Sequence, residues 1–171
     1  MIAETIPGDR AVHLDALHTL RRTLGLAAEV VPALLVVLCA APVAAPMFGP
    51  GFPDTHDGRN HLLHLASLAM SLGDHLGYVR WSGQLDLGYG SPIFSYYAPL
   101  PYYGALALTG FGLDVTDALR YFFASGIVVS ALATYALGRE LGGRTAGFAA
   151  GVSAAVLPYQ LHDVYVRGAL G

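Results

Sequence analysis

The amino-acid sequence predicts an all-α integral membrane protein, and three observations lead to this prediction. Hydrophobic residues make up 54% of the chain, charged residues make up only 12%, and the mean hydropathy is +0.52. Charged residues make up about 25% of an average soluble domain. The apolar residues also form long blocks instead of recurring at the spacing of a soluble core. We therefore expect the lipid bilayer as a partner, and a net charge of −3 gives no reason to expect nucleic acid.

Residues 1–23 are polar and residues 24–47 are apolar. Crossing a bilayer takes roughly 20 apolar residues, so the second block predicts transmembrane helix 1. A cleaved signal peptide is the alternative, because "APVAAP" resembles a cleavage site, but such peptides have shorter apolar cores near the chain start. Arg21 and Arg22 precede the apolar block. They favour a cytoplasmic location for residues 1–23.

Residues 48–117 form the most polar part of the chain and predict a first extracytoplasmic loop. Turn-forming residues open this loop, and a helix is expected over 57–76, capped by Asp54, Thr55 or Asp57. Leucines and Ala69 fall on one face of this helix. The opposite face carries Asp57, His61, His64, Ser71 and His75. This pattern predicts an interfacial helix whose titratable face meets water or a cavity.

Three apolar stretches follow, at residues 100–113, 118–137 and 145–161. The first is too short and too rich in Gly and Pro for a typical span, so we expect a second interfacial helix there. The other two predict transmembrane helices 2 and 3. They are joined by a cytoplasmic loop at 138–144 and followed by a second extracytoplasmic segment at 162–171. If residues 100–113 crossed the membrane, the sides of these last two segments would exchange, and the arginine distribution does not decide between the two topologies.

The order of motifs resembles a known family. The segments "DTHDGRNHLLHLASL", "GYVRW", "GYGSPIFSYYAPLPYY" and "HDVYVRGAL" occur in that order. Together they are similar to bacterial membrane proteins labelled 6-pyruvoyl-tetrahydropterin synthase-related, which are not pterin enzymes. Those proteins in turn resemble the GT-C superfamily of polytopic glycosyltransferases. The resemblance implies a GT-C-like helical bundle in a bacterial plasma membrane, of which this chain would be the N-terminal part.

The resemblance also implies roles for particular residues. Asp57 matches an early acidic residue that binds the acceptor or acts as its base, and Asp163 matches a second acidic position. Arg80 and Arg167 are candidates for binding the phosphate of a lipid-linked sugar donor, because a guanidinium bonds two phosphate oxygens at once. The acceptor would be a glycan, a lipid or a protein.

Further candidates follow from residue type and spacing. Tyr96 and Tyr97 are candidates for a sugar-binding platform or for an aromatic belt at the membrane surface. His61 is a candidate for substrate binding or for lining a wet face. Asp57, His162 and Asp163 are candidate ligands for a divalent metal ion. The chain has "HD" where some family members have Asp-x-Asp or Asp-x-Glu, so metal dependence stays open.

Structural roles would explain the same residues. Asp57 would cap a helix, Arg80 would anchor headgroups beside Trp81, and Asp163 would pair with Arg167 at i and i+4. Three functions therefore compete. A glycosyltransferase acting on a polyprenyl-phosphate sugar outside the membrane comes first, and a transporter or flippase and a non-catalytic scaffold are the alternatives. A transporter should carry charge in mid-span, whereas residues 118–137 and 145–161 carry charge only at their edges.

Overall fold

The computed structural model describes residues 25, 28, 30–74 and 79–169, and the predicted cytoplasmic segment 1–23 lies outside this part. The structure is mostly helical (76%). Within the described residues it has no strand, only one isolated bridge between Ser82 and Ser91. The prediction of an all-α fold is therefore confirmed.

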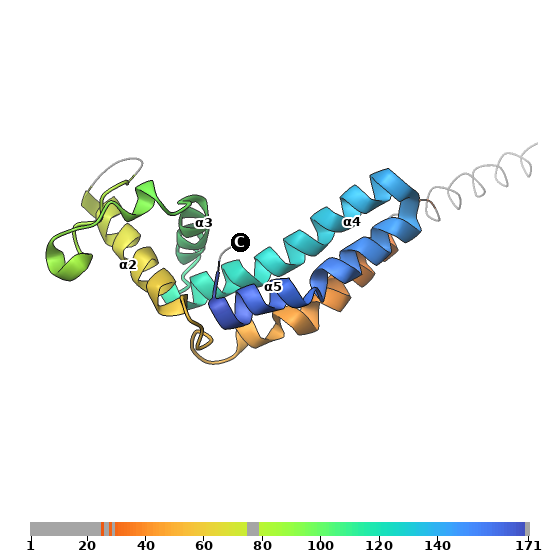
Figure 1. Cartoon of the computed structure of the whole chain (residues 1–171), viewed down its shortest axis with the longest axis horizontal. Coiled ribbons are helices and arrows are strands. Elements are labelled where there is room, and N and C mark those ends of the chain that lie inside the picture. The colour runs from red at the N-terminus through yellow and green to blue at the C-terminus, as the bar shows by residue number, and fades with distance from the viewer. Residues whose placement is uncertain (1–24, 26–27, 29, 75–78, 170–171) are drawn as a thin grey trace, which may run out of the picture.

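Three long helical segments lie side by side and form a bundle (Figure 1). The N-terminal helix runs over Val30–Phe48, and its last turn is the 3-10 helix η1 (Ala45–Phe48). Helix α4 (Val115–Ala155) is a hairpin, because Gly143 adopts φ 79° and ψ −174° and reverses the chain. Only glycine takes this conformation without a steric penalty. The reversal falls inside the stretch 138–144, where a loop is predicted.

The two arms of α4 pack closely because small residues line their contact. A β-carbon on Gly138 would meet Ala150, one on Gly147 would meet the backbone of Tyr135, and one on Gly151 would meet Tyr135. Small residues allow this approach of helix backbones. The high content of small residues in 145–161 therefore sets the distance between the arms.

The returning arm of α4 ends sooner than the sequence predicts. The residue before a proline is disfavoured in helical geometry, and Leu157, which precedes Pro158, has φ −59° and ψ 121°. A short helix, α5 (Pro158–His162), and a π-helical turn, η4 (Asp163–Arg167), follow. The predicted single helix over 145–161 is thus interrupted at Leu157.

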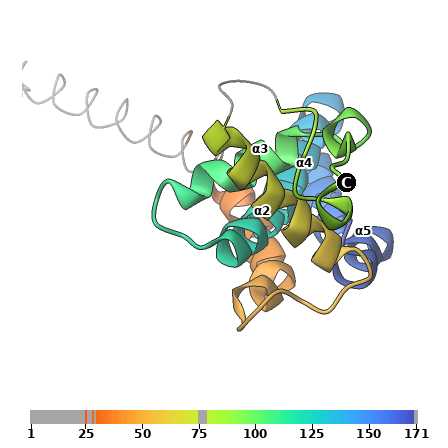
Figure 2. The same ribbon diagram turned by 90° about the vertical axis from the view of Figure 1, so that its left-hand side faces the viewer.

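A second group of elements covers one end of the bundle (Figures 1 and 2). It consists of α2 (Gly58–Asp74), the 3-10 turns η2 (Asp86–Gly88) and η3 (Ile93–Ser95), and α3 (Leu100–Thr109). At 1.5 Å per residue, α3 is about 15 Å long, half the thickness of a bilayer core. Its buried residues Tyr102 and Ala105 belong to the same core as Leu65 and Leu68 of α2. α3 is therefore a short helix that packs against α2.

The polar face of α2 is buried inside the protein. The sequence predicts that this titratable face meets water or a cavity, and the structure does not turn these side chains to open water. His61 and His64 are 4% and 9% exposed, and Ser71 is 4% exposed. Leu63 and Met70 are the large apolar side chains of this helix that are exposed. The histidines are buried because α3 supplies a hydrogen-bonding partner for them, described below.

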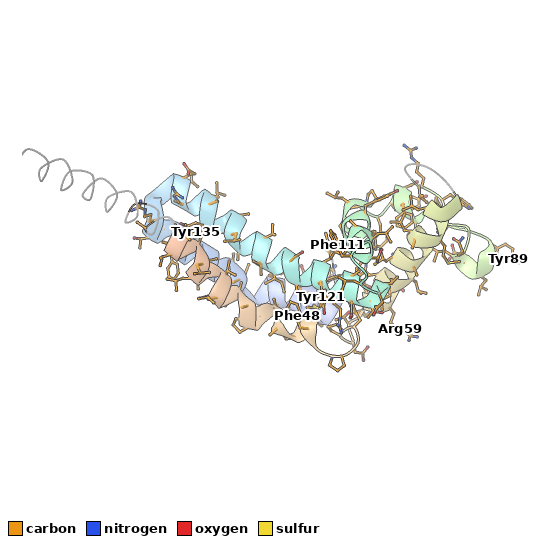
Figure 3. All side chains as sticks on the ribbon, turned by 180° about the vertical axis from the view of Figure 1, so that it is seen from behind. Phe48, Arg59, Tyr89, Phe111, Tyr121 and Tyr135 are labelled. Atoms are coloured by element: carbon orange, nitrogen blue, oxygen red, sulfur yellow. The ribbon has the colours of Figure 1, made fainter. Side chains whose placement is uncertain are left out.

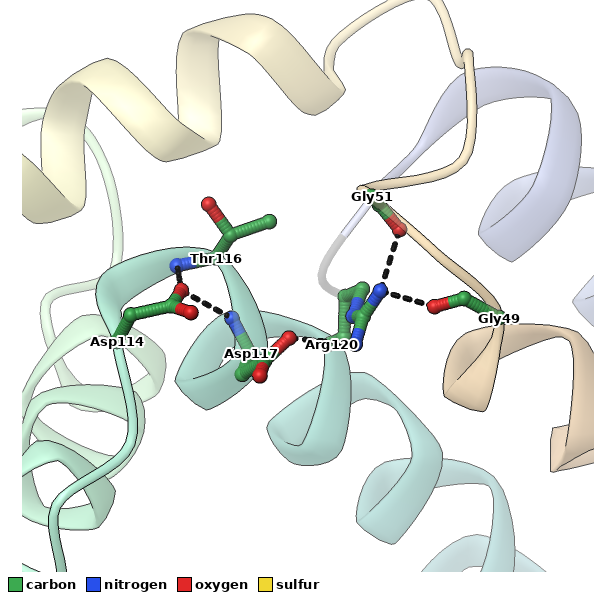
Figure 4. A network of polar contacts seen from close by, with 6 residues as sticks. All are labelled: Gly49, Gly51, Asp114, Thr116, Asp117 and Arg120. Atoms are coloured by element: carbon green, nitrogen blue, oxygen red, sulfur yellow. Dashed lines mark hydrogen bonds and ion pairs between the residues drawn. The ribbon is translucent and has the colours of Figure 1, made fainter.

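Arg120 joins the two parts of the fold (Figure 4). It is buried near the start of α4 and donates hydrogen bonds to the carbonyl oxygens of Gly49 and Gly51 and to the carboxylate of Asp117. Burial of a charge is costly unless the charge is paired and hydrogen-bonded. Arg120 therefore fixes the turn that leads from the N-terminal helix to α2.

Two helical segments are long and apolar enough to cross a membrane. They are Val30–Phe48, with a mean hydropathy of 2.3, and Val115–Arg167, with a value of 1.5. Only 22% and 28% of their most apolar windows are buried inside the protein. Apolar side chains accordingly project outward around the bundle (Figure 3). Length and composition also fit a signal sequence for the segment near the N-terminus.

Candidate functional site

The site lies where the end of the chain returns to the start of α2. We call residues 163–169 the C-terminal strap. The backbone N–H groups of His56 and Asp57 donate hydrogen bonds to the carbonyl oxygens of Val166 and Arg167, at 3.0 and 2.7 Å. These two bonds bring together residues that are about 110 positions apart in the chain.

Thr55 and Gly168 make this contact possible. The hydroxyl of Thr55 accepts a hydrogen bond from the N–H of Gly58 at 3.1 Å, so Thr55 caps the start of α2. Gly168 has φ 72°, and a β-carbon there would collide with the side chain of Thr55. Thr55, and not the carboxylate of Asp57, therefore caps the start of α2.

A cavity of about 160 Å³ opens between α2, α3 and the strap. We call it the polar cavity. Its lining includes four of the predicted site residues, which come from three separate segments of the chain. The lining residues are Asp57, His61, Tyr97, Ala98, Pro101, Tyr102, Arg167 and Ala169.

A larger cavity of about 400 Å³, the apolar cavity, adjoins the first. The two share Pro101 and Ala169 in their walls. The first arm of α4 supplies one side of the apolar cavity, and α5 with the strap supplies the other. Its remaining lining residues are Phe122, Phe123, Gly126, Ile127, Ser130, Leu157, Tyr159, Gln160, Asp163 and Val164.

Opposite charges meet in the polar cavity. The Oδ1 atom of Asp57 lies 3.2 Å from Nδ1 of His56, and the carboxylate side chain is 35% exposed. Arg167 donates a hydrogen bond from Nη1 to Oδ1 of Asp163 at 3.0 Å. The side chain of Arg167 is nevertheless 53% exposed, so part of its guanidinium group can reach a ligand.

A buried hydroxyl connects α3 to both histidines of α2. The hydroxyl oxygen of Tyr102 lies 2.6 Å from Nδ1 of His61 and 3.2 Å from Nδ1 of His64. Tyr102 itself is 1% exposed. Rings of Tyr97 and Phe123 pack around the group. We call Tyr102, His61 and His64 the buried triad.

Burial changes the proton affinity of every member of the buried triad. It lowers the pKa of His61, against a smaller upward effect of the Asp57 carboxylate and of a hydrogen bond with the Gly168 backbone. It also lowers the pKa of His64, and the neighbouring His61 acts in the same direction. Burial raises the pKa of Tyr102, so its hydroxyl keeps its proton. Near neutral pH the buried triad is therefore uncharged.

The structure places the other predicted site residues outside the polar cavity. Asp163 lines the apolar cavity and reaches the polar one only through its bond to Arg167. Tyr96 is 81% exposed, and neither it nor Arg80 nor His162 lines either cavity. Among the described residues, no group of three or more His, Cys, Asp or Glu side chains could hold a metal ion. The proposed metal ligands Asp57, His162 and Asp163 thus do not gather.

Tyr102 and His64 belong to the site but were not among the predicted site residues, although the sequence places His64 on the polar face of α2. Tyr102 is one of four tyrosines between positions 96 and 103, and nothing in that cluster distinguishes it from its neighbours. The spacing of His61 and His64 on one helix face is a usable signal, because residues three apart share a face. A partner for that face could come only from tertiary structure.

The chain was compared with protein-family models, with curated proteins and with solved structures, and no significant match was found. The resemblance to GT-C glycosyltransferases consequently stays a prediction based on the motifs quoted above.

Proposed function

We propose that this protein is a membrane-embedded glycosyltransferase that moves a sugar from a polyprenyl-phosphate donor to an acceptor outside the cytoplasm. The observation that carries the proposal is that Asp57 and Arg167 line the same cavity. Transfer of a sugar away from a phosphate requires a carboxylate and a guanidinium group that face the same cavity. One group removes a proton from the acceptor, and the other stabilises the leaving phosphate.

Asp57 would act as the base. The acceptor hydroxyl attacks the anomeric carbon of the sugar, and its proton passes to the Asp57 carboxylate. The bond between the anomeric carbon and the phosphate oxygen breaks, and the oxygen keeps the electron pair. The partial exposure of Asp57 at the cavity wall supports this role, because a base must lie within reach of the proton that it removes.

Arg167 would hold the phosphate. Its guanidinium group donates one hydrogen bond to Asp163, which leaves further N–H groups for phosphate oxygens. Asp163 would therefore act as a positioning residue that orients Arg167. This replaces the direct catalytic role that the resemblance implies for Asp163.

The apolar cavity would receive the first isoprene units of the donor lipid. Its walls are largely aromatic and aliphatic, and it adjoins the polar cavity at Pro101 and Ala169. A ligand with an anionic head and a hydrocarbon chain matches this pair of cavities in both size and polarity. The chain would enter from the bilayer between α4 and α5.

In this proposal the helical bundle lies in the bilayer, and α2, α3 and the strap lie at its outer surface. The N-terminal helix is about 28 Å long, close to the thickness of a bilayer core. The alternative functions receive less support. A transport pathway should pass through the bundle, whereas both cavities lie at or near the end covered by α2 and α3. A non-catalytic scaffold would not explain why a charged cavity lies beside an apolar one.

The test is sugar transfer by the intact protein in lipid nanodiscs. A panel of radiolabelled polyprenyl-phosphate monosaccharides serves as donor, and bacterial cell-envelope extract serves as the acceptor source. Formation of free polyprenyl phosphate is measured. We expect Asp57→Asn to lower the rate at least a hundredfold while the helical circular dichroism signal stays unchanged, since removal of a base costs about 10²–10⁴-fold.

Asp54→Asn is the matched control, because Asp54 is an exposed carboxylate three residues earlier in the same loop. It should keep the rate of the unaltered protein. If the two variants transferred sugar equally well, or if no donor in the panel were consumed, the proposal would be wrong.

A further inference from the structure

Exposed aromatic side chains gather at one end of the helical bundle. Phe48 is 60% exposed at the end of the N-terminal helix, Phe111 is 85% exposed just before α4, and Tyr159 is 68% exposed in α5. Tyr121 lies near the start of α4, and its ring packs against Phe48 with the ring centroids 5.2 Å apart. We call Phe48, Phe111, Tyr121 and Tyr159 the aromatic belt. The proposed mechanism uses none of these four residues.

The aromatic belt lies at one level along the bundle. Figure 3 shows Phe48, Tyr121 and Phe111 across the bundle at the end that α2 and α3 cover. Tyr159 belongs to the same end, because it lines the apolar cavity together with Phe122, the neighbour of Tyr121. The four residues come from separate elements, so the fold and not one helix face brings them to this level.

From the aromatic belt toward the other end, the bundle presents an uncharged aliphatic surface. Residues 30–47, 122–138 and 145–157 contain no charged side chain. Their exposed large side chains are all Val or Leu: Val30, Val31, Leu34, Leu35, Leu38, Val129, Leu137, Val156 and Leu157. Charge returns with Arg139 and Arg144, on the two sides of the reversal at Gly143. From Tyr121 to Arg139 the helix is about 27 Å long, close to the roughly 30 Å of a bilayer core.

We propose that the aromatic belt lies in the headgroup layer of the leaflet beside α2 and α3 and sets the depth of the bundle in the bilayer. Tyrosine is enriched at this level because its ring is apolar and its hydroxyl is polar. Phenylalanine at the boundary of headgroups and acyl chains removes its ring from water. A protein partner would explain the aromatic side chains, but not the uncharged aliphatic surface that adjoins them. Only the assignment to the outer leaflet rests on the proposed function.

This depth would bring the strap to the level of lipid phosphates. The Tyr165 hydroxyl donates a hydrogen bond to the carbonyl oxygen of Val43, which lies within the last two turns of the N-terminal helix. Arg167 follows Tyr165 by two residues, and its side chain is 53% exposed. A lipid phosphate would therefore meet Arg167 without leaving the headgroup layer.

The same depth would leave Trp81 in water, in place of the headgroup anchor that its position beside Arg80 suggests. A β-carbon on Gly90 would collide with the Trp81 indole, so this ring packs on the loop that carries Tyr89. Figure 3 shows Tyr89 on the far side of α2 from the bundle. Trp81 is the one tryptophan of the chain and is 56% exposed. It is therefore a natural reporter on the position of this loop.

Quenching of tryptophan fluorescence in phosphatidylcholine vesicles tests the proposal. The quenchers are acrylamide in the water, lipids brominated at the headgroup end of the acyl chain, and lipids brominated at its methyl end. In the unaltered protein we expect acrylamide to quench Trp81 several-fold more strongly than either brominated lipid does. This measurement needs no variant.

Single tryptophans in a Trp81→Phe background then measure the depth of the belt. Phe48→Trp and Phe111→Trp should be quenched most by the lipids brominated at the headgroup end. Leu38→Trp should be quenched most by those brominated at the methyl end, because Leu38 lies about 15 Å along the helix from Phe48. Tyr89→Trp is the matched control, since Tyr89 is as exposed as Phe111 but lies outside the belt, and acrylamide should quench it most.

Three results would overturn the proposal. They are the same quenching pattern for Phe111→Trp and Tyr89→Trp, stronger quenching of Phe111→Trp by the methyl-end lipids, and quenching of Trp81 in the unaltered protein by the lipids. The first result with acrylamide as the main quencher would point to a surface that meets water or a soluble partner. The vesicles contain no sugar donor, so none of these results would decide whether Asp57 takes part in sugar transfer. A failure of sugar transfer would likewise leave the measured depths unchanged.

Discussion

Gly168 lies directly against Thr55, with no room between them for a methyl group. The contact lets the strap approach the start of α2 and form its two backbone bonds there. It also requires a left-handed residue, since Gly168 has φ 72°. The placement of Arg167 beside Asp57 therefore depends on Gly168, although this residue carries neither a charge nor a catalytic group.

Gly168→Ala should destabilise the protein more than the same change at an unobstructed left-handed glycine. Gly112 is the control, since it has φ 89° and open space where a β-carbon would stand. We expect a loss of about 1–2 kcal/mol for Gly112→Ala from backbone strain. We expect about 1–3 kcal/mol more for Gly168→Ala from the collision with Thr55. Chemical unfolding in detergent micelles gives both values, and equal losses would refute the packing argument.

Arg120→Met should cost about 3–5 kcal/mol of stability, because it leaves the Asp117 carboxylate and the carbonyl oxygens of Gly49 and Gly51 without their donor. Arg120→Lys should recover only part of the loss, since an ammonium group lacks the planar fork. Arg59→Met, at an exposed position on α2, serves as the control and should change stability by less than about 0.5 kcal/mol. If Arg120→Met left the stability unchanged, the junction would not depend on this side chain.

Two glycine substitutions in α4 should change stability in opposite directions. A β-carbon at Gly151 would press on Tyr135, Ala131 and Val36, whereas one at Gly126 would meet nothing. Gly151→Ala should therefore cost about 1–3 kcal/mol by overpacking. Gly126→Ala should gain up to about 1 kcal/mol from helix propensity. Thermal unfolding followed by circular dichroism measures both changes in stability. A gain of stability in both variants would disprove the close contact of the hairpin arms.

Arg167→Gln should weaken binding of the donor more than it slows chemistry at saturation. The probe is binding of polyprenyl phosphate compared with the uncharged polyprenol. We expect the unaltered protein to prefer the phosphate at least tenfold, and Arg167→Gln to lose most of this preference, since hydrogen bonds to a charged group contribute about 1.5–3 kcal/mol. Arg59→Gln should keep the preference. If removal of Arg167 left it intact, another cation would have to be the phosphate ligand.

The stability of the fold should fall in acid, because burial disfavours protonation of two histidines in the folded protein. His61 and His64 have a lowered pKa in the folded protein, so the unfolded chain binds protons more readily as the pH drops below about 6.5. The unfolding temperature should decrease from about pH 7.5 to about pH 5.5. The double variant His61→Gln and His64→Gln should show a smaller decrease than the unaltered protein. Parallel pH profiles would exclude the two histidines as the cause.

Much of the helical architecture could be predicted from the sequence because it depends on local properties. Apolar runs of sufficient length predict long helices, and the glycine and proline content of residues 100–113 predicts a short one. Even Leu157 carries a local signal, since the residue before a proline is disfavoured in a helix. The grouping of Asp57, His61, Tyr97 and Arg167 around one cavity could not be predicted in this way, since it depends on backbone bonds across the whole chain.

The sequence by itself determined that the chain is helical, that its long helices are apolar, and which charged residues are available near their ends. Tertiary structure alone decided that the histidine face of α2 is buried, because only α3 brings the Tyr102 hydroxyl to it. It also decided that Asp163 lines the apolar cavity and Arg167 the polar one, whereas their ion pair at i and i+4 follows from local spacing. The physical reason is the same in both cases. The environment of a polar side chain depends on the partner that folding places opposite it, and that partner can come from any distance along the chain.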